Sequence, residues 1–112
     1  MHTSMIETIT YQDSNGHKPY AEWLDSLTDR QAKARILVRV NRMAAGNFGD
    51  CKPVRDGVLE LKIDIGPGYR VYISRQGPLL VLLLCGGDKT DQSRNIERAI
   101  AYLKDWKQRG KP

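Results

Sequence analysis

The stretch that decides the fold of this chain reads Val58-Leu59-Glu60-Leu61-Lys62-Ile63-Asp64-Ile65-Gly66-Pro67-Gly68-Tyr69-Arg70-Val71-Tyr72. Apolar and polar residues alternate from Leu59 to Ile65, which is the pattern of a strand with one buried face. Gly66-Pro67-Gly68 is a turn sequence, and the alternation resumes at Tyr69. The stretch therefore predicts an antiparallel hairpin.

A register symmetric about Pro67 pairs Asp64 with Arg70, Lys62 with Tyr72 and Ile65 with Tyr69. One face of the hairpin then carries the polar residues of both strands, which are Glu60, Lys62, Asp64, Arg70, Tyr72 and Ser74.

Further strands are expected on both sides of this hairpin. Downstream, Gln76-Gly77-Pro78 turns the chain, and the apolar run Leu79–Cys85 predicts a central strand covered on both faces. The glycine-rich segment 86–91 is predicted to be a flexible loop. Upstream, Met5–Tyr11 is β-branched and predicts a strand, whereas Asn47–Gly57 reads as a loop.

Three helices are predicted from the spacing of apolar residues. A short helix contains Tyr20, Trp23, Leu24 and Leu27. A second begins at a Thr28 or Asp29 cap and runs to about Ala45, and the last spans about Asp91 to Gln108. The expected order is β-α-α-β-β-β-α with an antiparallel sheet, which is a single α+β domain over residues 1–112.

The charge of the chain is unevenly distributed. The 112 residues contain 18 Lys and Arg against 13 Asp and Glu, a net charge of +5. Residues 1–29 contribute −4 (five acids, one base) and residues 30–112 contribute +9 (17 bases, eight acids). The second predicted helix carries five bases and no acid on one side, namely Arg30, Lys33, Arg35, Arg39 and Arg42. This pattern predicts a surface for an anionic nucleic acid or a protein partner, with a solubility bias as the alternative.

Several classes of protein are excluded by the sequence. The longest apolar run has seven residues, against the roughly 20 that span a bilayer. Met1–Ser4 lacks the start of a signal peptide, so we expect a cytoplasmic protein without membrane contact. Cys51 and Cys85 form no metal-ligand pattern, and the chain has no nucleotide-binding or hydrolase motif. We therefore expect no metal and no cofactor.

The polar face of the hairpin suits phosphate chemistry. Arg70 carries a guanidinium that can bind phosphate through two nitrogens, and Lys62 and Lys89 add positive charge nearby. RNA cleavage on such a face requires a base for the 2′-hydroxyl, an acid for the leaving oxygen and charge stabilisation of the phosphorus, which Lys and Arg can supply. A surface ion pair with Arg70 is the other interpretation of Asp64.

The hairpin Gly66-Pro67-Gly68-Tyr69-Arg70-Val71-Tyr72, together with Gly86-Gly87-Asp88-Lys89, resembles the RelE/ParE toxin superfamily. More narrowly, nearly the whole chain is similar to the HigB-like addiction module killer proteins of type II toxin–antitoxin systems. This resemblance implies a RelE-like (microbial RNase-like) fold and a cognate helix-turn-helix antitoxin of HigA type. The antitoxin neutralises the toxin, and contact with operator DNA occurs only through it.

RelE- and HigB-like members cut mRNA on the ribosome, so the resemblance implies a metal-independent endoribonuclease. Arg70 matches the arginine that acts on the scissile phosphate, and Lys62 and Lys89 match basic positions of that site. RNA-binding residues are then expected to be Arg35, Arg39, Arg42, Tyr72 and Arg94.

The chain departs from the family pattern at three points. Glu60 stands where RelE-like enzymes often have a second lysine, and the start of the last helix offers Asn95 and Ile96 instead of a catalytic tyrosine. The active-site histidines of some HigB proteins have no counterpart here. These departures leave the general base and acid unassigned.

Two alternatives come from the same resemblance. A ParE-type toxin inhibits DNA gyrase by protein contact without cleaving RNA. An inactive toxin serves only as co-repressor with its antitoxin.

Overall fold

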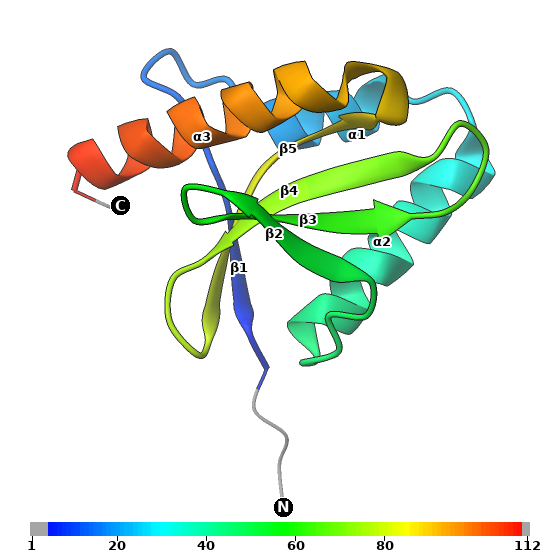
Figure 1. Ribbon diagram of the computed structural model, residues 1–112, viewed down its shortest axis with the longest axis horizontal. Coiled ribbons are helices and arrows are strands. Elements are labelled where there is room, and N and C mark those ends of the chain that lie inside the picture. The colour runs from blue at the N-terminus through cyan, green and yellow to red at the C-terminus, as the bar shows by residue number, and fades with distance from the viewer. Residues whose placement is uncertain (1–4, 111–112) are drawn as a thin grey trace, which may run out of the picture.

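The computed structural model describes residues 5–110 as a five-stranded sheet with helices on both faces (Figure 1). In chain order the elements are β1 (Glu7–Thr10), α1 (Pro19–Ser26), α2 (Arg30–Ala44), β2 (Cys51–Arg55), β3 (Val58–Ile63), β4 (Tyr69–Arg75), β5 (Leu80–Asp88), the short 3-10 helix η1 (Lys89–Asp91) and α3 (Gln92–Gln108). The expected α+β class with three α-helices is confirmed. Met1–Ser4, used above against a signal peptide, lies outside the described residues. Within them, no helix is long and apolar enough to cross a membrane.

The sheet differs from the expectation in two respects. Its strand order is β1-β5-β4-β3-β2, and β1 pairs with β5 in parallel, so the sheet is not wholly antiparallel. The segment predicted as a loop contains β2, which gives the order β-α-α-β-β-β-β-α. Pro53 makes this segment unlike a strand in sequence, because proline cannot donate a hydrogen bond to the ladder. The structure accommodates Pro53 because β2 is an edge strand. Asp56 (φ 52°) and Gly57 (φ 86°) form the turn into β3, and this Asp-Gly pair is a hairpin signal within the segment predicted to be a loop.

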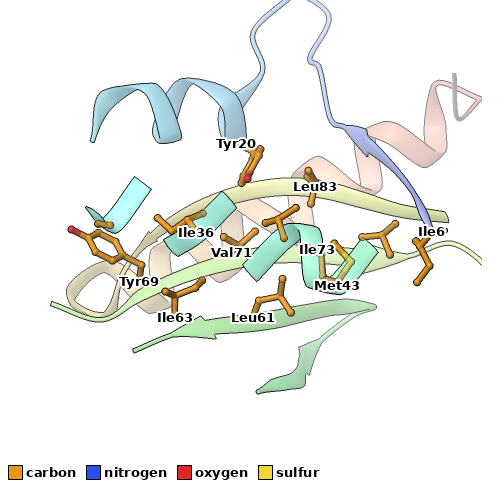
Figure 2. Packing of buried hydrophobic residues seen from close by; sticks show 13 residues of the cluster. Ile6, Tyr20, Ile36, Met43, Leu61, Ile63, Tyr69, Val71, Ile73 and Leu83 are labelled. Carbon is orange, nitrogen blue, oxygen red and sulfur yellow. The ribbon is translucent and has the colours of Figure 1, made fainter. Parts of the chain in front are cut away.

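Two apolar cores lie on opposite faces of the sheet. One packs α1 and α2 against β3, β4 and β5, as the close view of Tyr20, Ile36, Met43, Leu61 and Val71 shows (Figure 2). The other packs α3 on the opposite face through Ala99, Leu103 and Trp106. Each strand of the meander therefore sends alternate residues to a different helix layer.

The helix ends follow the predicted signals. Asp29 caps α2, its carboxylate accepting hydrogen bonds from the amides of Gln31 (3.0 Å) and Ala32 (3.2 Å). Gly46 follows α2 with φ 98°, a conformation that favours glycine and ends the helix.

The segment predicted as a flexible glycine-rich loop is instead the end of β5. Gly86 and Gly87 are buried within this strand, where Gly87 pairs with Arg70 of β4. A Cβ at Gly86 would meet the ring of Trp23 with Cδ2 at 2.7 Å, and one at Gly87 would collide with the amide of Asn95. Glycine is therefore required because α1 and α3 approach the strand closely from its two faces.

Candidate functional site

The β3–β4 hairpin carries the two central cations of the site. Lys62 lies directly opposite Arg70, and Glu60 lies opposite Tyr72. The expected register, which paired Asp64 with Arg70 and Lys62 with Tyr72, is therefore wrong. Because the shift is two residues and side chains alternate with a period of two, the assignment of residues to faces is unaffected.

The register error comes from the length of the turn. The ladder ends at Ile63 and Tyr69, so residues 64–68 form the loop. Hydrogen bonds from Ile65 N to Ile63 O (3.1 Å) and from Gly68 N to Ile65 O (2.9 Å) fold this loop. Ile65 continues the apolar alternation beyond the last paired residue, so the sequence pattern does not show where pairing stops.

A small cavity brings together the three residues predicted to be catalytic. It has a volume of about 140 Å³ and is lined by Lys62, Asp64, Gly66, Pro67, Gly68, Arg70 and Lys89. Among the described residues, none of the ion pairs involves Lys62 or Lys89. Both residues are exposed and line the cavity, so their charges are accessible to an anion.

The carbonyl of Gly68 contacts both Arg70 and Lys89, two of the residues that line this cavity. It accepts a hydrogen bond from the backbone amide of Lys89 at 3.0 Å and one from Nη1 of Arg70 at 3.4 Å. Lys89 is thus held beside the hairpin as the first residue of η1 and does not belong to a free loop. Gly68 has φ 82°, so another residue there would strain the backbone that presents this carbonyl.

Behind the cavity lies a buried polar cluster. The carboxylate of Glu60 accepts hydrogen bonds from Tyr72 Oη (3.1 Å) and Gln92 Nε2 (2.8 Å), and Arg70 Nε lies 3.6 Å from the same oxygen. Arg70 is only 9% exposed and Glu60 only 2%. The sequence alternation placed Glu60 on this face but gave it no role, and no sequence signal pointed to Gln92.

Tyr72 is fully buried, so the expectation that it contacts RNA directly is wrong. Burial, together with the negative charge of Glu60, raises the pKa of its phenol. The hydroxyl stays protonated and donates to Glu60. Tyr72 packs in the core beneath α3, a position that alternation alone cannot distinguish from an exposed one.

The basic side of α2 continues the site along the molecular surface. A larger groove, about 490 Å³, is lined by Arg35, Val38, Arg39, Arg42, Lys62, Ile63 and Asp64. Lys62 and Asp64 line both this groove and the small cavity. The three arginines predicted to bind RNA therefore line the same groove as Lys62, one of the residues predicted to be catalytic. Arg39 is half-buried and donates to Asp50 O at 2.9 Å.

Part of the groove lies where β3 extends past its pairing with β2. The amide of Lys62 donates to Asp50 O (3.0 Å), just before β2 begins, and beyond this point β3 has no neighbouring strand on that side. The open edge of the sheet next to α2 forms the floor of the groove.

Arg94 does not line the small cavity but lines a separate hollow, which has Lys89 in common with it. It is exposed near the start of α3 and shares a surface hollow with Lys89, Thr90, Asp91, Gln92 and Ser93. Asp88 fixes the entry to this turn, accepting from the amide of Thr90 at 2.9 Å. Hydrogen bonds from the Thr90 hydroxyl and amide lower the pKa of Asp88, so its carboxylate is charged at neutral pH.

The chain is 51% identical over 80 residues to an uncharacterized protein of Haemophilus influenzae, and the match covers 71% of the chain and 81% of that protein. The chain belongs to the family of this Haemophilus influenzae protein. No family model matches the chain. Because the description of the Haemophilus influenzae relative names no activity, membership of its family assigns neither substrate nor partner.

The chemistry of the site in this family member rests on cations. Within residues 5–110, no three His, Cys, Asp or Glu side chains are grouped so that they could hold a metal ion. The groups that face the small cavity are one guanidinium, two ammonium groups and one carboxylate. Such a set has the chemistry to bind a phosphate and to stabilise additional negative charge on it.

Proposed function

We propose that this protein is the toxin of a type II toxin–antitoxin system, a HigB-like member of the RelE/ParE superfamily that cleaves mRNA on the ribosome. The observation that carries the proposal is the convergence of Lys62, Arg70 and Lys89 on one small cavity at the end of the sheet. The α+β architecture with helices on both faces of a mainly antiparallel sheet is compatible with the RelE-like (microbial RNase-like) fold.

In this proposal Arg70 contacts the scissile phosphate. Its guanidinium is held by Gly68 O at 3.4 Å and faces the cavity beside Lys62 and Lys89. The 2′-hydroxyl gives its proton to a base and its oxygen attacks the phosphorus, the bond to the 5′-oxygen breaks, and the leaving oxygen takes up a proton. Negative charge grows on the non-bridging phosphate oxygens during this step, and the three cations stabilise that charge more than the charge of the ground state. Lys62 is the group placed to act as base or electrostatic partner, and Lys89 binds RNA.

The size of the cavity supports dependence on an external scaffold. Its volume of about 140 Å³ is below the roughly 300–1,000 Å³ of pockets that enclose a small ligand. The site can therefore hold a phosphate group but cannot align two nucleosides for in-line attack. A ribosome that presents the mRNA in a fixed conformation would supply this alignment.

The groove beside α2 supports binding to RNA. Arg35, Arg39 and Arg42 form a basic track that joins the cavity at Lys62. Contacts to phosphate give affinity without reading sequence, as docking on ribosomal RNA requires. Arg94, which lines a separate hollow together with Lys89, extends the positive surface.

The outer side of α2 supports a protein partner as well. Leu37 and Val38 are 44% and 46% exposed, next to the arginines of the groove. An acidic segment with an apolar stripe would match this mixture, and we assign the surface to a HigA-like antitoxin with a helix-turn-helix DNA-binding domain. Operator DNA is then contacted through the antitoxin. A ParE-type contact with DNA gyrase is the alternative that the same exposed apolar residues favour.

Induced expression of Arg70→Ala tests the proposal. We expect wild type to arrest growth and to cut translated mRNA, seen by toe-printing with ribosomes and absent without them. Arg70→Ala should lose both effects, Arg70→Lys should keep part of them, and Arg98→Ala should keep both. Arg98 is an exposed arginine of α3 that lines neither cavity, so it controls for loss of charge.

Each alternative function has a distinct outcome in this experiment. Intact transcripts together with an induced DNA-damage response would replace the nuclease with a gyrase inhibitor. A wild-type protein that causes no growth defect would indicate an inactive co-repressor. Unchanged toxicity of Arg70→Ala in a folded protein would remove Arg70 from the mechanism.

A further inference from the structure

The least exposed charged group behind the cavity is the carboxylate of Glu60. It is 2% exposed, lies on β3, and is contacted from strand β4 and helix α3, with β2 at its outer side. Tyr72 Oη donates at 3.1 Å, Gln92 Nε2 donates at 2.8 Å, and Arg70 Nε lies at 3.6 Å, all measured to Oε2. The other oxygen, Oε1, lies 4.0 Å from Nζ of the exposed Lys52.

Removing a charge pair from water costs several kcal/mol, and apolar residues of similar volume often stabilise a core as well or better. The Glu60–Arg70 pair is therefore not explained by stability. The pair instead sets the orientation of the Arg70 guanidinium, because Glu60 lies on its Nε side while Gly68 O contacts Nη1. Held at these two points, the guanidinium lines the cavity that it shares with Lys62 and Lys89.

The Nε of Arg70 is buried and has no hydrogen-bond partner among the described residues. A buried donor without a partner destabilises the folded protein, because it has lost its hydrogen bonds to water. Its nearest charged acceptor, Glu60 Oε2, is at 3.6 Å, and an approach to the usual 2.9 Å needs a movement of about 0.7 Å. A phosphate that binds the outer nitrogens and settles the guanidinium against Glu60 would gain this hydrogen bond.

We propose that Glu60 is the positioning residue for Arg70: held by Tyr72 and Gln92, its carboxylate orients the guanidinium toward the phosphate. This inference rests on the proposed nuclease function. Glu60 does not line the cavity, so it does not contact substrate and is not a catalytic residue. Gln92 begins α3 directly after η1, which carries Lys89, so the same carboxylate also links Arg70 to the segment that presents the third cation.

The test compares Glu60→Gln, which keeps the shape of the side chain and removes its charge, with Glu97→Gln. Glu97 is an exposed glutamate of α3 paired with Arg55, away from the cavity. In single-turnover cleavage on programmed ribosomes, we expect Glu60→Gln to lower the saturating rate at least tenfold and to leave the half-saturating concentration within twofold. Glu97→Gln should change neither quantity.

Two further measurements separate positioning from general damage to the fold. In the Arg70→Lys background, Glu60→Gln should cause no further loss of rate, because the group it orients is gone. The Arg70 Nε–H resonance should be sharp in wild type, shift when inorganic phosphate is added, and broaden by exchange with water in Glu60→Gln. Equal additional loss in the Arg70→Lys background, or an unchanged Arg70 resonance in Glu60→Gln, would overturn the proposal.

The resonance measurement does not depend on catalysis. If wild type cuts no RNA, the nuclease function fails, while the response of Arg70 to phosphate in the two proteins still decides the role of Glu60. If wild type cuts RNA and Glu60→Gln cuts it equally fast, the positioning role fails and the nuclease function stands.

Discussion

Replacement of Gly86 by alanine probes the close approach of helix α1 to strand β5 near the site. Gly86 is buried in β5, and a Cβ there would meet three ring atoms of Trp23, with Cδ2 at 2.7 Å and Cε3 and Cζ3 closer still. Ordinary carbon contacts are about 3.5–4.0 Å, so the ring must move by about 1 Å or the strand must shift. Neither is easy, because Trp23 packs between Tyr20 and Tyr69, with ring centroids 6.3 Å away on each side.

The sign of the change in the free energy of unfolding distinguishes a steric collision from the ordinary preference of a strand for alanine over glycine. Without a collision, Gly→Ala inside a strand stabilises by roughly 0.5–1 kcal/mol. Overpacking of this kind costs about 1–3 kcal/mol, and the depth of the overlap places Gly86→Ala near 3 kcal/mol. For a domain of about 100 residues this lowers Tm by about 12 °C or more. Such a loss is a large part of a typical stability of about 5–15 kcal/mol.

Urea denaturation followed by circular dichroism measures the effect. Gly77→Ala is the control, because a Cβ there meets nothing within 4 Å and only the φ of 111° is strained. We expect Gly86→Ala to be the more destabilising of the two. In a Trp23→Leu background, which removes the ring, the cost of Gly86→Ala should fall below about 1 kcal/mol. A neutral Gly86→Ala, or an equal cost in both backgrounds, would refute the reasoning.

Three further predictions concern the cap of α2, the buried Tyr20 and Cys85, and the surface charge of Arg35. Asp29→Ala should lower the free energy of unfolding by about 1 kcal/mol, because the α2 cap is lost; an unchanged urea midpoint would contradict this. Burial raises the pKa of Tyr20 from 10.0 and of Cys85 from 9.0, both to about 12. Between about pH 9 and 12 the unfolded chain has released protons that the native state keeps, so stability falls as pH rises. Thermal melts at pH 7, 9 and 10.5 check this sign, and a Tm that rises with pH would be inconsistent with it. Arg35→Ala should weaken co-sedimentation with ribosomes and reduce the slope of log affinity against log salt by about 1; the same slope as wild type would place Arg35 outside the RNA contact.

Part of the candidate site could be predicted from the sequence. The sequence places Lys62 and Arg70 on the polar face of the hairpin and Lys89 shortly after the glycine pair, and the structure brings all three to one cavity. Glu60 could be placed on the correct face, but not assigned a partner. Gln92 contacts it from 32 residues away, and no local pattern encodes a contact across such a separation.

The sequence by itself determined the features that depend on neighbours along the chain. Alternation fixed the strands β3 and β4 and their faces, apolar spacing fixed α2 and α3, and Asp29 and Gly46 fixed the ends of α2. Each of these is encoded within a few residues, because side-chain direction follows the local period of the backbone.

Only the tertiary structure decided how these elements meet. The five-residue loop, and with it the pairing of Lys62 with Arg70, became visible only there. The same holds for the parallel pairing of β1 with β5 and for the burial of Tyr72. The tertiary structure also showed that Gly86 and Gly87 serve the close approach of α1 and α3 and do not provide a flexible loop. The physical reason is the same in each case: pairing and burial depend on atoms from distant parts of the chain, and alternation is identical whether a residue's neighbour is water, a helix or a carboxylate.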